Sequence, residues 1–237
     1  MIKHRQNTLI ILVIAVLLSS GCARKNLLLP EDTLSTPGTA VLAWAAESPK
    51  AAMYRRGSQG LLDIAANMAV GRGLSSRLEE EEVAPLIRDQ FLNRFRGNLE
   101  QKGFRVEVID TAIDLSGAEK PDEKGDDIPP YDFRPLVKSS AKYLVFVKVK
   151  TFGAARNYYG FIPLGAPQGT ASLDGYFIRL PENKVVAEQH SEANLDVVGS
   201  EWDTPPRYQA LIDAGKKALA DAVNEIEGNF FRSPSGG

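Results

Sequence analysis

The sequence is poor in the two residues that most often build metal sites and nucleophilic centres. It contains one cysteine, Cys22, and two histidines, His4 and His190. A single cysteine excludes a disulfide within the chain and an all-cysteine zinc site, and two histidines exclude a His-rich zinc site. A Ser-His-Asp triad would have to use His190, which we expect to be an ordinary, partly exposed residue of a strand.

Sequence fingerprints of catalysis and nucleotide binding are also missing. No Gly-x-Ser-x-Gly elbow, dinucleotide-binding fingerprint or phosphate-binding P-loop occurs. Gly57–Gly60 could bind a phosphate at the start of a helix, but a turn and helix cap is the favoured interpretation. The acidic run Asp122–Asp127 lacks the spacing of a calcium-binding loop, so we expect a solvated loop there. Paired carboxylates for glycoside cleavage are neither indicated nor excluded. We expect no enzymatic activity, no catalytic residue, no metal and no bound cofactor.

Long apolar runs are limited to one, Leu9–Leu18, near the N-terminus. Its ten residues are too few to cross a bilayer core of about 30 Å, which requires about twenty. The run follows the basic residues Lys3 and Arg5 and precedes small residues and Cys22. This arrangement predicts a cleaved signal peptide over residues 1–21.

The six residues that end at Cys22, with the letters LLSSGC, resemble the lipobox of bacterial lipoproteins. They depart from the usual lipobox because Leu18 stands four residues before the cysteine and Ser19 takes the usual leucine position. The resemblance implies that Cys22 becomes the mature N-terminus and carries S-linked diacylglycerol and an N-linked acyl chain, which suffices for stable anchoring. By analogy with enterobacterial sorting, Ala23 and Arg24 point to the outer membrane, on its periplasmic side. An ordinary secretory signal, or a buried free thiol at Cys22, is the alternative.

Positive charge is not in excess. The formal net charge of −2 becomes −4 once Lys3 and Arg5 are removed with the signal peptide. This balance argues against nucleic acid as a partner and leaves the acyl chains as the expected membrane attachment.

The remaining chain is expected to form a single periplasmic domain over residues 39–230. Residues 22–38 contain Pro30 and Pro37 and show little periodicity, which predicts a lipidated N-terminus and flexible tether. Fully extended, such a tether would reach roughly 50 Å. Residues 231–237 are expected to be a disordered tail.

Hydrophobic periodicity predicts an α+β fold with the element order β-α-α-β-α-β-β-β-α and a single mixed sheet of about five strands flanked by helices. The predicted strands are 39–46, 104–109, 143–149, 170–180 and 184–197, and the predicted helices are 60–71, 83–102, 133–140 and 206–230. Residues 114–130 and 153–168 are expected to be loops. This order resembles that of the periplasmic α/β domain shared by the N-terminal domain of TolB and the lipoproteins LpoB and CsgG. The resemblance covers about residues 40–228, and fold analogy alone assigns no function.

One predicted loop, Asn157–Gly165, is unusually apolar for a loop. It contains five large apolar or aromatic residues, namely Tyr158, Tyr159, Phe161, Ile162 and Leu164. If exposed, they form a contact surface for a partner protein, a glycan or the bilayer, because large apolar patches rarely stay bare. If folded back, they form a lid over the edge of the sheet, which is the slightly favoured interpretation.

Three functions follow from these features. The leading hypothesis is a membrane-anchored, non-enzymatic scaffold or activator that binds another envelope protein. The second is a homo-oligomeric subunit of a secretion or export assembly. The third, resting only on the apolar loop, is a module that binds a glycan or small molecule.

Overall fold

The computed structural model describes residues 27–45, 52–57, 83–123, 125–160, 162–197 and 208–232. The predicted signal peptide, Cys22 and the helix predicted at 60–71 lie outside these residues. Among the described helices, none has both the length and the apolar character needed to span a membrane.

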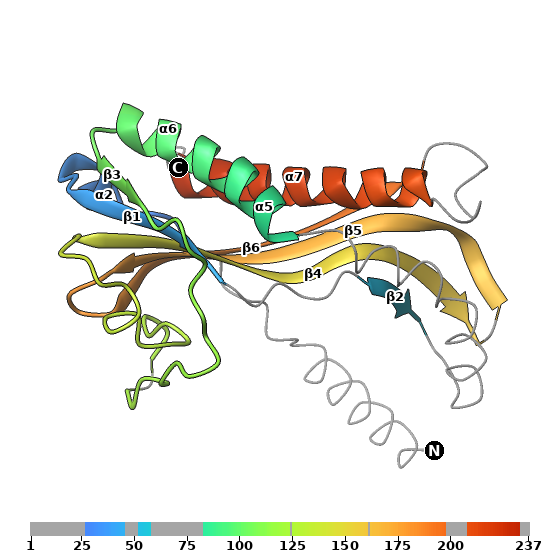
Figure 1. Ribbon diagram of the computed structural model, residues 1–237, viewed down its shortest axis with the longest axis horizontal. Helices are drawn as coiled ribbons and strands as arrows, with labels where there is room; N and C mark the ends of the chain where they lie inside the picture. Colours follow the sequence, from blue (N-terminus) through green and yellow to red (C-terminus); the bar gives the residue numbers. More distant parts are fainter. Residues whose placement is uncertain are drawn as a thin grey trace, which may run out of the picture.

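A mixed β-sheet extends along the long axis of the molecule (Figure 1). Its strands lie in the order β3 (Arg105–Val108), β1 (Thr39–Trp44), β4 (Tyr143–Tyr159), β5 (Ile162–Arg179) and β6 (Lys184–Asp196). β1 pairs in parallel with β3 and β4, whereas β4, β5 and β6 pair antiparallel. A further strand, β2 (Ala52–Arg56), pairs in parallel with the second half of β4. The predicted α+β class and mixed sheet are confirmed, and β2 is a strand that periodicity did not predict.

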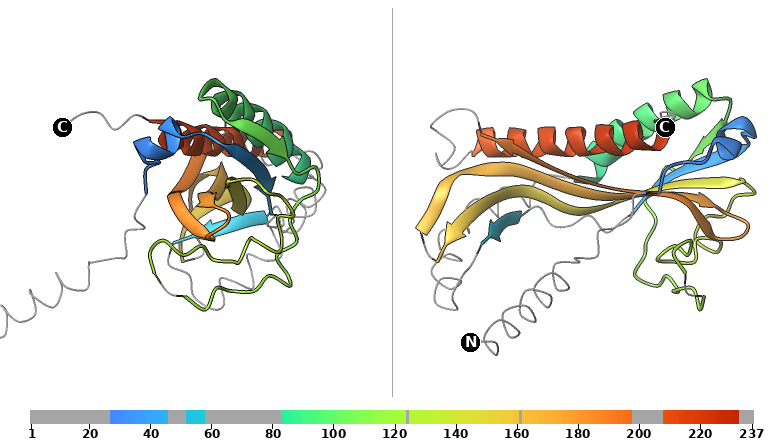
Figure 2. Two further views of the ribbon diagram at one scale, coloured as in Figure 1. Left: turned by 90° about the vertical axis from the view of Figure 1, so that its left-hand side faces the viewer. Right: turned by 180° about the vertical axis from the view of Figure 1, so that it is seen from behind.

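Helices cover one face of this sheet (Figures 1 and 2). They are α2 (Glu31–Ser35), a continuous helical segment made of α5 (Val83–Ile87), the π-helical η1 (Arg88–Leu92) and α6 (Asn93–Gln101), and the long α7 (Gln209–Phe231). The helices predicted at 83–102 and 206–230 are confirmed with these bounds.

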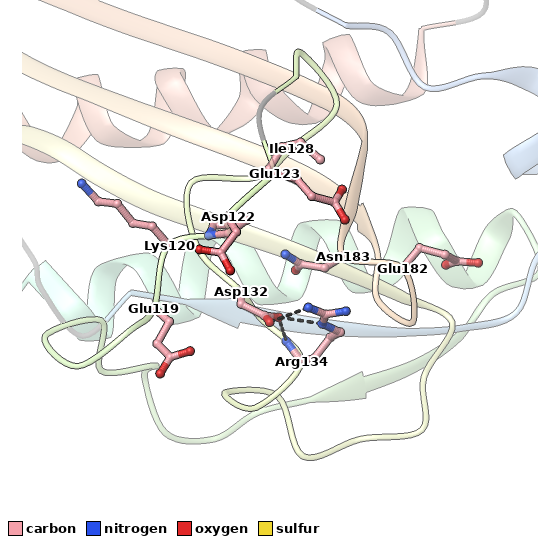
Figure 3. Close-up of a pocket in the computed structure, with 10 residues that line it drawn as sticks. Glu119, Lys120, Asp122, Glu123, Ile128, Asp132, Arg134, Glu182 and Asn183 are labelled. Carbon is pink, nitrogen blue, oxygen red and sulfur yellow. Dashed lines mark hydrogen bonds and ion pairs between the residues drawn. The ribbon is translucent and has the colours of Figure 1, made fainter.

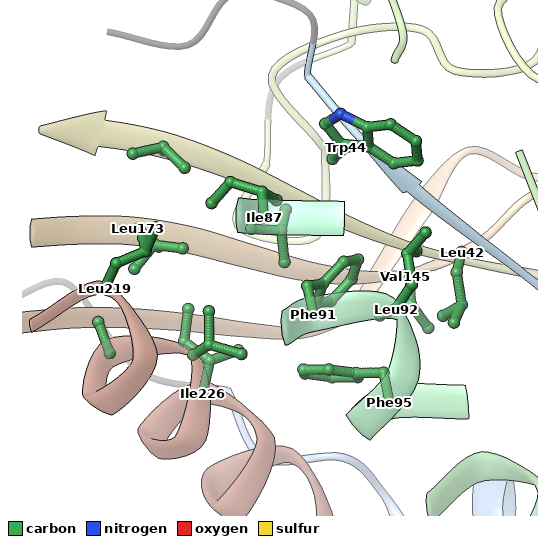
Figure 4. Packing of buried hydrophobic residues seen from close by; sticks show 14 of the residues in the cluster. Leu42, Trp44, Ile87, Phe91, Leu92, Phe95, Val145, Leu173, Leu219 and Ile226 are labelled. Atoms are coloured by element: carbon green, nitrogen blue, oxygen red, sulfur yellow. The ribbon is translucent and has the colours of Figure 1, made fainter. Parts of the chain in front are cut away.

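The main core lies between those helices and the sheet (Figure 4). Phe91 of η1, Phe95 of α6 and Ile226 of α7 are fully buried. They pack against strand residues such as Val145 and Leu173. This is the apolar stripe that helical spacing predicts. Each such side chain contributes roughly 1.5–3 kcal/mol of burial free energy.

On the opposite face, an irregular segment, residues 109–123 and 125–142, covers the part of the sheet around β1 and the start of β4. Its buried side chains form a second core with the strands, and the rings of Phe133 and Phe146 lie 4.8 Å apart. The start of β4 is therefore covered on both faces, as its continuous apolar run predicts.

The helix predicted at 133–140 is wrong. Residues 134–136 form a turn, in which the backbone N–H groups of Leu136 and Val137 both donate to Phe133 O (3.1 and 2.9 Å). The Ser139 hydroxyl then accepts the N–H of Ala141 at 3.1 Å. Such local side-chain bonds compete with the helical pattern, which explains why the apolar spacing was misleading.

For residues 27–38 the tether prediction is also wrong. Leu27 forms a β-bridge with Glu188 of β6, Leu29 is buried in the main core, and α2 follows. Leu27 and Leu29 pack against the two hydrophobic cores at the edge of the sheet. This segment is therefore part of the domain.

Candidate interaction site at the hairpin tip

The most unusual feature of the molecule is the length of the β4–β5 hairpin. Its strands have 17 and 18 residues, or about 55 Å at about 3.3 Å per residue. Both strands continue past the N-terminal end of α7 and curve away from the helical face (Figures 1 and 2). The loop predicted at 153–168 is therefore wrong, because these residues extend the hairpin to its tip.

The tip is a tight turn between directly paired residues. Tyr159 pairs with Ile162, and Asn157 pairs with Leu164. Gly160 has φ of +58°, a conformation that two-residue hairpin turns require and that glycine adopts without steric cost. The backbone conformation at Gly160 is therefore set locally and does not depend on contacts with the core.

Three large apolar side chains share one face of the tip. Because side chains alternate along a strand, Tyr159, Ile162 and Leu164 project on the same side of the ribbon. Their exposed fractions are 73%, 52% and 55%. They make up a contiguous exposed apolar surface, which we call the hairpin tip patch.

A register shift sets the direction of this patch. The β4–β5 pairing shifts between Ala155 and Asn157, which leaves Arg156 at the irregularity. Arg156 Nε donates to the backbone O of Gly165 at 2.9 Å, which ties the two strands together there. Such bulges bend a strand and increase its twist, so this one re-aims the last residues of the hairpin.

Charge is distributed unevenly along the hairpin. From residue 143 to residue 173 the sequence has no Asp or Glu, while Lys148, Lys150 and Arg156 are basic. The irregular segment, whose buried side chains form part of the second core, carries the acidic residues Glu119, Asp122, Glu123, Asp126 and Asp127. Between residues 143 and 173, the charged residues of the hairpin are therefore all basic.

The predicted site residues can now be placed. Tyr159, Ile162 and Leu164 are exposed and Tyr158 is half-buried, whereas Phe161 lies outside the described residues. The lid interpretation is wrong for the three exposed residues, because the hairpin carries them outward. The sequence could indicate their apolar character but could not reveal the hairpin that displays them.

A polar cluster on the sheet face opposite α7 escaped the sequence analysis. The buried carboxylate of Asp174 contacts Lys150 Nζ at 3.1 Å and His190 Nδ1 at 2.8 Å. Beside it, the hydroxyl groups of Thr151 and Ser172 hydrogen-bond at 2.8 Å. His190 is a partly exposed strand residue, as predicted. The arrangement compensates the buried charge of Asp174, which is a structural role.

A pocket of about 190 Å³ lies between the irregular segment and the β5–β6 turn at Glu182 and Asn183 (Figure 3). Half of its lining residues are acidic, and Arg134 forms a bidentate pair with Asp132 at 2.6 and 2.8 Å. The hydrogen bond from Arg134 holds the pKa of Asp132 below its usual value. Nearby, the hydrogen bond from Lys184 lowers the pKa of Asp127. No three or more His, Cys, Asp or Glu residues in the described ranges are arranged to hold a metal ion.

Comparison with known proteins gives only distant likenesses. No family model and no curated protein matches the sequence. Among solved structures, the chain is similar to protein XCC0632 from Xanthomonas campestris, with 14% identity, a TM-score of 0.42 and coverage of 81% of this chain and 82% of that one. It is also similar to the PelC dodecamer of Paraburkholderia phytofirmans, with 11% identity, a TM-score of 0.36 and coverage of 88% and 97%. A third is lipoprotein GNA1162 from Neisseria meningitidis, with 10% identity, a TM-score of 0.32 and coverage of 81% and 98%. No functional conclusion follows from likenesses of this degree, and the resemblance to TolB, LpoB and CsgG stays a prediction.

Proposed function

We propose that this chain is a lipid-anchored, non-enzymatic protein of the bacterial cell envelope that binds another envelope protein through the hairpin tip patch. The observation that carries the proposal is the exposure of Tyr159, Ile162 and Leu164 at the end of a hairpin that extends beyond the core. Apolar surface of this kind is characteristic of contact sites.

The energetics of the patch favour a binding role. Covering one Ile or Leu side chain contributes roughly 1.5–3 kcal/mol, and tyrosine is enriched among the residues that dominate protein interfaces. The two-stranded backbone holds the three side chains in fixed relative positions. Fewer degrees of freedom are then lost when a partner binds.

The anchor is the second part of the proposal. The lipobox-like stretch supports S-diacylglycerol and N-acyl modification of Cys22 and a place on the periplasmic side of the outer membrane. Metabolic labelling with palmitate tests it directly. Wild-type protein should incorporate label and fractionate with outer membranes, whereas Cys22→Ala should do neither. Equal labelling of both proteins would contradict the anchor.

A photocrosslinking amino acid at position 159 tests the partner. Irradiation of living cells should yield one discrete crosslinked envelope protein. A probe at Glu100, an exposed residue of α6 at the other end of the molecule, provides the matched control. Identical products from both positions, or none from position 159, would count against the patch.

A homo-oligomeric assembly is the second candidate, favoured by the outer edge of β6. Apart from the bridge at Leu27, no strand among the described residues pairs with that edge. Open strand edges can pair with a second copy of the same chain. In this case a probe at Asp196, an exposed residue of β6, would crosslink to the protein itself, and light scattering of the acylated protein would show a multiple of the monomer mass.

A further inference from the structure

The N-terminal end of the described chain is fixed to the edge of the sheet. Leu27 N–H donates to Glu188 O at 2.9 Å, and Glu188 N–H donates to Leu27 O at 3.1 Å. Gln189 Nε2 also donates to Leu27 O, at 3.0 Å. Because Leu29 and Thr33 are buried just beyond, the position of Leu27 on the sheet is set by the fold.

Very little chain separates this fixed point from the predicted anchor. Only residues 23–26 lie between Cys22 and Leu27. Five Cα–Cα steps span at most about 18 Å when fully extended. With the acyl chains of Cys22 in the bilayer, the edge of β6 at Glu188 must lie within about that distance of the headgroups. The long tether expected from the sequence would have allowed far greater freedom.

The side chains beside this point suit a lipid surface. Leu28 is 47% exposed, and the only other large hydrophobic residues this exposed in the described part of the chain are those of the hairpin tip patch. Arg24 and Lys25 lie in the short connecting segment. Basic residues close to anionic headgroups contribute about 1 kcal/mol each.

We propose that the domain rests on the bilayer through the edge of β6 near Glu188, with Leu28 in the headgroup region. This inference rests on the proposed anchoring of Cys22. It also sets the distance between the bilayer contact and the hairpin tip patch. Ile162 stands fourteen residues before Tyr176, the β5 residue paired with Glu188, which is about 46 Å along the strand. The bilayer contact and the partner contact are thus two separate surfaces on one rigid sheet.

Site-specific fluorescence tests the bilayer contact. Acylation consumes the only native cysteine, so Leu28→Cys provides a single thiol for an environment-sensitive NBD label. The matched control is Leu164→Cys, the same residue type with similar exposure at the tip patch. Both acylated proteins are bound to vesicles of phosphatidylethanolamine and phosphatidylglycerol. The label at position 28 should shift to shorter emission wavelength and be quenched by lipids with nitroxide headgroups, and the label at 164 should respond as in water.

The outcomes separate this inference from the proposed function. Protein that floats with vesicles while the position-28 label remains in water would overturn the bilayer contact and leave the anchor intact. Protein that does not float would overturn the anchor and this inference with it. Lipid contact at both positions would support the contact at Leu28 and remove the tip patch as a protein-binding surface.

A second variant tests the role of the short connection. A flexible Gly/Ser insertion of about twenty residues between Asn26 and Leu27 adds an average reach of about 25 Å. Quenching at position 28 should then fall while flotation persists. Unchanged quenching would overturn the claim that the short connection holds the domain on the bilayer.

Discussion

The two halves of the β4–β5 hairpin share one backbone pairing but differ in what covers them. In the first half, Val145 pairs with Phe177 and both side chains are fully buried, with helices on one face of the sheet and the irregular segment on the other. In the second half, Tyr159 and Ile162 pair in the same way and are exposed. The comparison shows that apolar residues in a strand indicate contact but do not say with what. In the first half the contact is the core, and at the tip we propose that it is a partner.

Truncation of a core residue in the covered half should have the largest effect. The ring centroid of Phe177 lies 5.4 to 6.3 Å from the ring centroids of Phe104, Tyr143 and Phe230. Phe177→Ala should lower the free energy of unfolding by about 3–5 kcal/mol. Tyr159→Ala, the matched aromatic truncation at the tip, should change it by less than about 0.5 kcal/mol. Urea unfolding followed by circular dichroism measures both, and equal losses would mean that the tip is part of the core.

Close packing of α7 on the hairpin gives the next largest effect. A Cβ at Gly169 would lie 2.2 Å from the backbone carbon of Ala214, whereas a Cβ at Gly97 of α6 would meet nothing within 4 Å. Gly169→Ala should destabilise the domain by about 1–3 kcal/mol through overpacking. Gly97→Ala should stabilise it by about 0.4–1 kcal/mol, because it restricts the unfolded chain in a helical position. The denaturation midpoints of the two variants should move in opposite directions, and movement in the same direction would refute the packing argument.

The smallest of the three effects should be a change in folding stability at acidic pH. It should depend on the irregular segment and not on the tip. The pKa of Asp132 is lowered from 3.8 in the folded state, chiefly by the hydrogen bond from Arg134. Its stabilising contribution is therefore complete above the unfolded value and is lost as the pH falls through the folded value. Asp132→Asn should be less stable than wild type at pH 7, and the difference should shrink as the pH falls below 3.8.

Thermal melting over a pH series checks this prediction. Tyr159→Ala provides the control, since no acidic residue lies in the hairpin between residues 143 and 173. Its small stability difference from wild type should not depend on pH in this range. A difference for Asp132→Asn that persists undiminished at pH 3 would mean that the carboxylate pair does not contribute.

The elements with strong periodicity could be predicted from the sequence. The helical stripe through Phe91 and Phe95 and the doubly covered start of β4 follow from side-chain spacing, because one face or both must be buried. The tip could not be predicted in the same way. Glycine at 153, 160 and 165 and proline at 163 are typical of a loop, and only the long pairing with β5 shows that these residues extend a hairpin.

Two other misses have a common physical cause. Leu27 and Asp174 owe their structure to partners far away in the sequence, at Glu188 in one case and at Lys150 and His190 in the other. Local composition carries no record of such pairings. The candidate site was therefore predictable as a set of apolar residues, and its exposure was not.

The most direct test is the yield of the crosslinked envelope complex from cells that express Tyr159→Ser/Ile162→Ser/Leu164→Ser, relative to wild type. The photocrosslinking residue is placed at Asn157, beside the patch. Because the three side chains are exposed, the melting temperature should be unchanged. We expect the yield to fall at least about tenfold, equivalent to about 1.4 kcal/mol of binding free energy. An undiminished yield from the stably folded triple variant would contradict the claim that the hairpin tip patch is the binding surface.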